Sequence, residues 1–173
     1  MEERKKMAKE KNKIINEYHL NRHEPDKPQF ALHDLGEYLK TNACQTVKPH
    51  IHSFYQVIWF KKGRGKHAVD FRTYDVSDHT FFFVAPNQVH YFDAHTDYEG
   101  ILLHFNALFL AQEQSPMEFF LNYNLFNNPY QQPSCRIGKE IDHILDRYIV
   151  QITEEMKNEE RLGKELLLKN YLQ

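Results

Sequence analysis

Short runs of apolar and aromatic residues, separated by turn-forming residues, occupy the middle of the chain. They lie at residues 54–60, 66–74, 81–85, 89–94 and 100–105. The intervening turn signals are Gly63 and Gly65, residues 75–78, the pair Pro86-Asn87, and residues 95–97. Residues 30–33 and 36–39 look like a short strand pair leading into this region. Strands at this spacing, without helices between them, predict an antiparallel sandwich or barrel.

The hydrophobic period changes from two to that of a helix after residue 106. Ser115-Pro116-Met117-Glu118 is a helix start with a capping box, and Asn127-Asn128-Pro129 ends that short helix. Apolar residues then recur at steps of three and four: Ile137, Ile141, Ile144, Leu145, Tyr148, Ile152 and Met156. This spacing predicts an amphipathic helix of about five turns. A last helix with Leu162, Leu166 and Leu167 reaches Gln173 without a C-cap signal, so we expect the sequence to be cut within a helix.

The pattern divides the chain into three parts. Residues 1–29 are rich in Lys and Glu and predict a charged N-terminal arm or short helix. Residues 30–110 form the β-domain, and residues 111–173 form a helical extension. The single apolar stripe of that extension allows two interpretations, a helix packed on its own domain or a seam between two copies. We favour a dimer seam formed by the following residues: Ile137, Ile141, Ile144, Leu145, Tyr148 and Ile152.

Composition narrows the class of protein. The chain has 173 residues, 41% of them hydrophobic and 14% aromatic, which is enough for one packed domain. Its net charge is −2, and it lacks the basic excess of chains that bind nucleic-acid phosphates. Cys44 and Cys135 are far apart and form no CxxC pair, so a reducing compartment is expected. No apolar run approaches a bilayer span. We therefore predict a soluble, cytoplasmic protein that does not insert in membranes.

Polar side chains concentrate at the start of the clearest strand. His50 and His52 are two residues apart and Gln56 is four further on, so all three should project to one side of the strand. His90 follows another apolar run. Trp59 has the opposite parity and should pack outside the barrel. An amide and three imidazoles on an apolar inner wall predict a binding site.

Three chemistries fit this cluster. His50, His52 and His90 could ligate a transition metal, they could form a hydrogen-bonded polar wall, or they could bind a small organic effector. We favour the effector, with no cofactor and no catalytic residue. The predicted ligand-binding residues are His50, His52, Phe54, Gln56, His67, His90 and Phe92. Ile58 and Phe60 share their parity and should line the same space as core, whereas His79, His95 and His104 have no evident partner.

Three segments carry a resemblance to a known family. PHIHSFYQVIWFKKGRG (49–65) resembles the first motif of the cupin barrel, and FFVAPNQVH (82–90) resembles the second. YEGILLHFNALFL (98–110) looks like the late strand that follows. More narrowly, the segments resemble the sensor domain of AraC-type transcription regulators. Gln56 stands where metal-binding cupins carry Glu, and Asn87 stands at a common glycine, although Asn tolerates a left-handed turn.

The resemblance implies a cupin-type antiparallel β-barrel followed by helices. It also implies a homodimeric domain that senses a small molecule, such as a sugar or small acid. DNA would be read only by a C-terminal helix-turn-helix unit that this sequence lacks. We keep two alternatives, a metal-dependent single-domain cupin enzyme acting on a small polar substrate, and a cupin that only dimerises.

Overall fold

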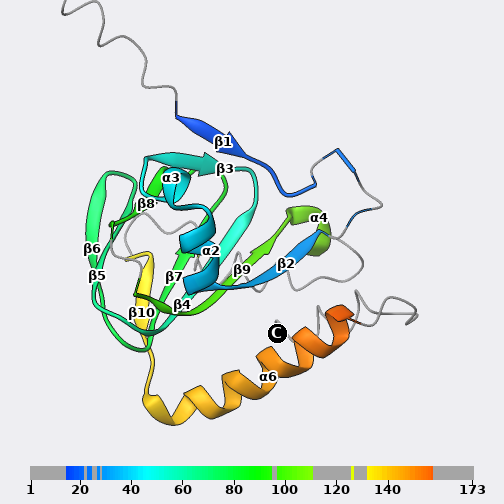
Figure 1. Cartoon of the computed structure of the whole chain (residues 1–173). Helices are drawn as coiled ribbons and strands as arrows, with labels where there is room; N and C mark the ends of the chain where they lie inside the picture. The colour runs from blue at the N-terminus through cyan, green and yellow to red at the C-terminus, as the bar shows by residue number, and fades with distance from the viewer. Residues whose placement is uncertain are drawn as a thin grey trace, which may run out of the picture.

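The computed structural model describes residues 15–21, 23–24, 27, 29–94, 97–110, 126 and 132–157, and within these the strands pair into two separate five-stranded sheets (Figure 1). The first sheet has the order β1 (Asn16–Tyr18), β3 (His50–His52), β8 (His90–Phe92), β5 (Gly65–Val69) and β6 (Arg72–Val76). The second has the order β10 (Ser134–Arg136), β7 (Thr80–Val84), β4 (Tyr55–Lys62), β9 (Glu99–Phe105) and β2 (Phe30–Asp34). Neighbours are antiparallel except β1 and β3, which are parallel.

Four helices accompany the sheets within the described residues. They are α2 (Leu35–Thr41), α3 (Ala43–Thr46), α4 (Ala107–Leu110) and α6 (Lys139–Lys157). The side chain of Asp34 caps α2 by accepting a hydrogen bond of 2.8 Å from the backbone N–H of Glu37. Figure 1 shows α6 lying outside the strands rather than between them. No helix in the described ranges is both long and apolar enough to cross a membrane.

Two apolar layers hold the domain together, one on each face of the second sheet. Inside, the following residues are buried together: Leu35, Leu39, Ile58, Phe60, Val69, Val76, Phe82, Val84, Phe92, Tyr98 and Leu102. Outside, a second cluster includes Leu103, Phe105, Phe126 and Ile152 of α6. The alternation along β4 places Ile58 and Phe60 in the inner layer and Trp59 on the outer face, as their parity predicts.

Gly63 and Gly65 close one end of the fold against Tyr98. Gly63 has φ 133°, and a Cβ there would lie 2.5 Å from Cδ1 of Tyr98. A Cβ on Gly65 would lie 1.9 Å from the phenolic oxygen of the same residue. That hydroxyl donates a 2.6 Å hydrogen bond to Asp93. The glycine pair is therefore required because the backbone approaches a buried ring closely.

Two predictions of local structure are wrong. Residues 36–39 belong to helix α2, because the Asp34 cap and the burial of Leu35 and Leu39 favour a helix. The expected strand at 66–74 is two strands, β5 and β6, joined by a turn with positive φ at Asp70 (48°) and Phe71 (64°). Residues 16–18, expected in an arm or a short helix, form strand β1, which pairs with β3.

The other strand predictions are confirmed. Asn87 has φ 66°, the left-handed conformation expected where the family usually has glycine. The predicted amphipathic helix is confirmed as α6, although Ile137 precedes its first turn. The helix predicted from Ser115, and the last helix with Leu162, Leu166 and Leu167, lie outside the described residues.

Phe82 and Phe71 offer a matched test of the inner layer. Phe82 is 0% exposed and Phe71 is 78% exposed. We expect Phe82→Ala to lower the free energy of unfolding by about 3–5 kcal/mol, because it removes buried apolar contacts and leaves a cavity. Phe71→Ala should change it by less than about 0.5 kcal/mol. Urea denaturation of both variants would measure the difference, and equal effects would contradict the assignment of the core.

Candidate ligand-binding site

The interior of the β-domain holds a group of closely spaced imidazoles. The His90 ring centroid lies 4.2 Å from that of His50, 4.7 Å from that of His52 and 5.4 Å from that of His67. Strands β3, β5 and β8 supply these side chains, because their registers place His50 opposite His90 and His67 opposite Phe92. The structure thus brings together the four histidines that the sequence predicted to face inward.

A fifth buried histidine, His104, extends the group. His52 stacks on Phe54 at 4.4 Å, and the Phe54 ring lies 4.6 Å from His104. His104 in turn contacts His33 at 5.3 Å and Tyr38 at 5.7 Å. The sequence analysis assigned His104 no partner. The available signal was its parity in the strand at 100–105, which it shares with the core residue Leu102.

Two backbone carbonyls fix the tautomers of His50 and His52. Nδ1 of His50 donates to the carbonyl of Lys48 at 2.8 Å, and Nδ1 of His52 donates to the carbonyl of Phe54 at 2.6 Å. A carbonyl only accepts, so the hydrogen is on Nδ1 and the lone pair is on Nε2 in both rings. Their Nε2 atoms are therefore acceptors.

Several buried imidazole nitrogens have no hydrogen-bond partner among the described residues. They are Nε2 of His52, Nδ1 and Nε2 of His67 and of His90, and Nε2 of His104. A buried polar atom without a partner loses about 1–3 kcal/mol of solvation. This concentration of unpaired donors and acceptors in one place is typical of a site that receives a polar guest.

Burial keeps these imidazoles uncharged. Desolvation is the largest cause and lowers the pKa of His52 to about 4 and the pKa of His67 to about 3. It also lowers the pKa of His90 and of His104 well below the ordinary value, and repulsion between neighbouring imidazoles adds to the shift. At neutral pH each ring therefore offers one N–H donor and one lone pair.

The cluster borders a cavity of about 20 Å³. Its lining residues are Tyr18, Tyr38, Gln45, Thr46, His50, His52, Phe54, Gln56, His90 and Phe92. Six of the seven predicted ligand-binding residues are among them, and His67 is buried in contact with His90 and Phe92 instead. A volume of this size holds about one water molecule. Any larger guest requires part of the wall to move.

One part of this wall comes from elements that the sequence did not connect with the site. Tyr18 of β1 packs edge-on against His50 at 5.5 Å, and Tyr38 of α2, Gln45 and Thr46 of α3 complete the cover. Residues 16–18 were expected in an arm without a role, and residues 36–39 in a strand. No local pattern marks these side chains, because their position depends on how β1, α2 and α3 fold over the sheets.

The residues present do not fit the metal site that a cupin resemblance implies. Across the described ranges, no three His, Cys, Asp or Glu side chains are grouped as metal ligands. Gln56 supplies an amide oxygen where a carboxylate would help to balance the cation charge. His50, His52 and His90 are thus close together without forming a ligand set.

The six residues predicted for a dimer seam separate into two groups. Ile152 is 2% exposed, and Leu145 faces the second sheet. Ile141, Ile144 and Tyr148 are 41%, 44% and 45% exposed, although Tyr148 also lines the space between α6 and the second sheet. Ile137 is half-buried and precedes the helix.

Comparison with known proteins identifies the family. Residues 40–172 match the family described as the AraC-like ligand binding domain. This match covers most of the chain, so the chain belongs to that family, and the AraC resemblance expected from the sequence is confirmed. The mainly antiparallel β-fold followed by a helix is also confirmed, although the described strands form two sheets and not one closed barrel.

Individual relatives share limited sequence identity with this chain. The chain is 30% identical over 105 residues to the uncharacterized HTH-type transcriptional regulator YfiF of Bacillus subtilis (strain 168), covering 61% of this chain and 31% of that protein. The chain thus spans about a third of the length of that curated relative.

Among solved structures, the AraC-like transcriptional activator CuxR is 20% identical with a TM-score of 0.41, covering 69% of this chain and 41% of that one. Apo ToxT K231A from Vibrio cholerae strain SCE256 is 11% identical with a TM-score of 0.45, covering 84% and 54%.

The lowered pKa values predict a stability that falls in acid. A histidine whose folded pKa is below its unfolded value of about 6.5 stabilises the fold above that value. Its contribution is lost as pH falls from about 6.5 through the folded pKa. We expect the loss between pH 7.5 and pH 5.0 to be about 2 kcal/mol smaller in His67→Gln than in the parent, because one such group is removed.

Urea denaturation at the two pH values would measure this difference. His143→Gln, at an exposed position of α6, is the matched control and should keep the parent pH dependence. An unchanged pH dependence in His67→Gln would contradict a neutral buried imidazole at this position.

Proposed function

We propose that this chain is the effector-sensing module of a transcription regulator and that the interior histidine cluster binds the effector. The observation that supports this most directly is the set of buried imidazole nitrogens without a partner around one cavity. Neutral imidazoles and the Gln56 amide donate and accept hydrogen bonds without a net charge. No Lys or Arg lines the cavity. A small polyhydroxyl molecule such as a sugar suits this wall better than an acid does.

Effector binding would have to enlarge the cavity. The arm strand β1 has three residues, pairs with β3 along one edge and carries the Tyr18 side chain that covers His50. Displacing β1 breaks few hydrogen bonds, so it is the part of the cover that moves most easily. An effector that binds only the open arrangement would shift the population toward it. In this proposal, arm position is the first consequence of binding.

The output would be transcriptional. The B. subtilis relative is named as an HTH-type regulator and is about three times as long as the matched region. We infer that DNA contacts come from a part of the full protein beyond these residues, because the described chain offers no basic surface excess. The metal-dependent enzyme is the weaker alternative, since the histidines are not grouped as metal ligands in the described ranges.

The exposed stripe of α6 would form the dimer contact. Ile141, Ile144 and Tyr148 are spaced at three and four residues and are all more than a third exposed. A two-fold axis beside this stripe would place the same residues from both copies in contact. Leu145 and Ile152 belong to the same helical stripe but face the second sheet.

A thermal-shift screen against sugars and small acids tests the effector site. A ligand present at about 100 times its Kd should stabilise the protein by about 2.7 kcal/mol. The double variant His50→Ala/His90→Ala should lose this stabilisation, because it removes two cavity-lining imidazoles. The control His23→Ala/His143→Ala removes two exposed imidazoles and should keep it. A ligand shift that is the same in both double variants would exclude the cluster as the site.

Sedimentation velocity tests the dimer contact. Ile141→Asp/Ile144→Asp places two charges within the stripe and should give monomers at concentrations where the parent is dimeric. Val150→Asp changes an apolar side chain that is 54% exposed on the opposite side of α6 and should leave the dimer intact. A double variant that remains dimeric would place the contact elsewhere.

A further inference from the structure

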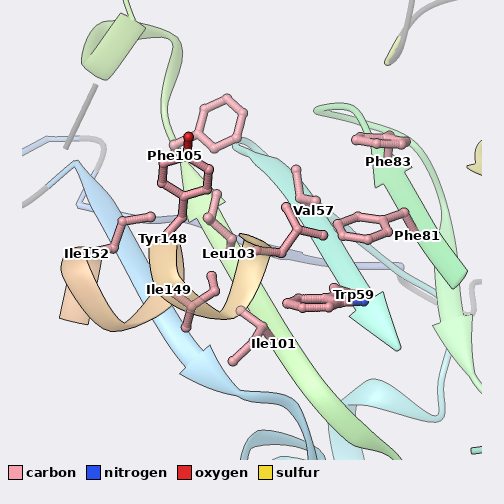
Figure 2. A pocket seen from close by; sticks show the side chains of 11 residues that line it. Val57, Trp59, Phe81, Phe83, Ile101, Leu103, Phe105, Tyr148, Ile149 and Ile152 are labelled. Atoms are coloured by element: carbon pink, nitrogen blue, oxygen red, sulfur yellow. The ribbon is translucent and has the colours of Figure 1, made fainter. Parts of the chain in front are cut away.

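A second, larger cavity lies between the outer face of the second sheet and helix α6 (Figure 2). Its volume is about 210 Å³, roughly ten times that of the interior cavity. Strands β4, β7 and β9 contribute Val57, Trp59, Phe81, Phe83, Ile101, Leu103 and Phe105, and α6 contributes Leu145, Tyr148, Ile149 and Ile152. Figure 2 shows the strand residues on one side and those of the helix facing them.

Fixed contacts on either side of this cavity hold the helix in place. Asp142 pairs with His79 at 2.7 Å, and Asp146 forms an ion pair with Lys61 of β4. Two turns further on, Ile152 is buried in the outer apolar cluster. Leu145 and Ile149 lie between these contacts and line the gap. The helix is therefore held against the sheet without filling the space beneath its middle.

The floor of the cavity is shaped for a flat molecule. The rings of Trp59 and Phe81 are stacked at 5.4 Å with an interplanar angle of 15°, and those of Phe81 and Phe83 are stacked at 6.2 Å and 20°. Parallel rings present a row of faces or edges on which another aromatic ring packs favourably. An apolar cavity of roughly 150 Å³ is already large enough to bind benzene.

One polar atom among the lining residues is unpaired. Trp59 is 2% exposed, and its indole N–H has no hydrogen-bond partner among the described residues. This N–H is buried within the packed wall and is not accessible from the cavity. Neither Lys61 nor Asp146 is available for a charged guest, because they pair with each other.

We propose that this cavity is a second ligand site, which takes a small, flat, uncharged aromatic compound. Its ring would pack against Phe81 and Phe83. The site is separate from the interior cluster, because Trp59 and Gln56 point to opposite faces of β4. A guest here would contact both the sheet and α6, including Tyr148 of the proposed dimer stripe.

Acetophenone is a suitable probe, and the protein supplies its own reporter. Trp59 is the only tryptophan of the 173 residues, so its fluorescence reports directly on this cavity. Titrating acetophenone into the whole chain should quench Trp59 in a saturable manner. The same compound should raise the melting temperature. Quenching that stays linear with concentration, without saturation, would overturn the proposal.

Matched variants locate the binding. Ile149→Phe fills the cavity from the helix side and should weaken acetophenone binding at least tenfold. Leu145→Phe does the same from the preceding turn and serves if the first variant does not fold. Val150→Phe adds the same ring at an exposed neighbouring position and should bind as the parent does. Equal affinity in the filled and control variants would overturn the proposal.

Saturable binding that is lost in His50→Ala/His90→Ala but kept in Ile149→Phe would place the compound in the interior cluster and overturn the second site. The two sites therefore succeed or fail independently.

Discussion

Burial of strand β4 on both faces is the constraint on which the rest of this structure depends. A strand covered on one side needs only one apolar surface, but β4 is covered by the first sheet on one side and by α6 on the other. Gln56, Ile58 and Phe60 therefore pack inside and Val57 and Trp59 outside, and a slip of one position would exchange the two sets. The histidine cluster and the apolar cavity lie on opposite faces of this one strand.

The two faces differ in how their polar atoms are treated. Inside, five imidazoles are kept neutral by desolvation and several of their nitrogens are left without protein partners. Outside, the charged groups Lys61, Asp146 and Asp142 are paired at the rim and hold the helix. The domain thus has an interior suited to hydrogen bonding and an outer layer suited to apolar contact. Membership of the AraC-like ligand binding domain family agrees with the proposal that the interior cluster binds a small molecule.

Much of this arrangement was predictable from local pattern. Alternation gave the inward direction of His52, Gln56 and Phe60 and the outward direction of Trp59, because a strand has a strict period of two. The recurrence of apolar residues every three or four positions predicted helix α6. The turn at Asp70 and Phe71 was missed because Phe favours strands and rarely adopts the left-handed conformation, although Asp tolerates it. The cover formed by Tyr18 and Tyr38 depends on packing between segments that are far apart in the sequence. The size of the interior cavity depends on the same packing, so no local sequence pattern predicts the cover or the cavity size.

The contact of Gly63 and Gly65 with the ring of Tyr98 has an evolutionary consequence. Any side chain at either glycine would overlap that ring. A larger residue at position 63 or 65 is therefore compatible only with a smaller residue at position 98. These three positions should therefore covary across the family, with larger residues at 63 or 65 found beside a small residue at 98. Asp93 accepts the hydrogen bond from Tyr98, so residue 93 should vary in relatives that lack this tyrosine.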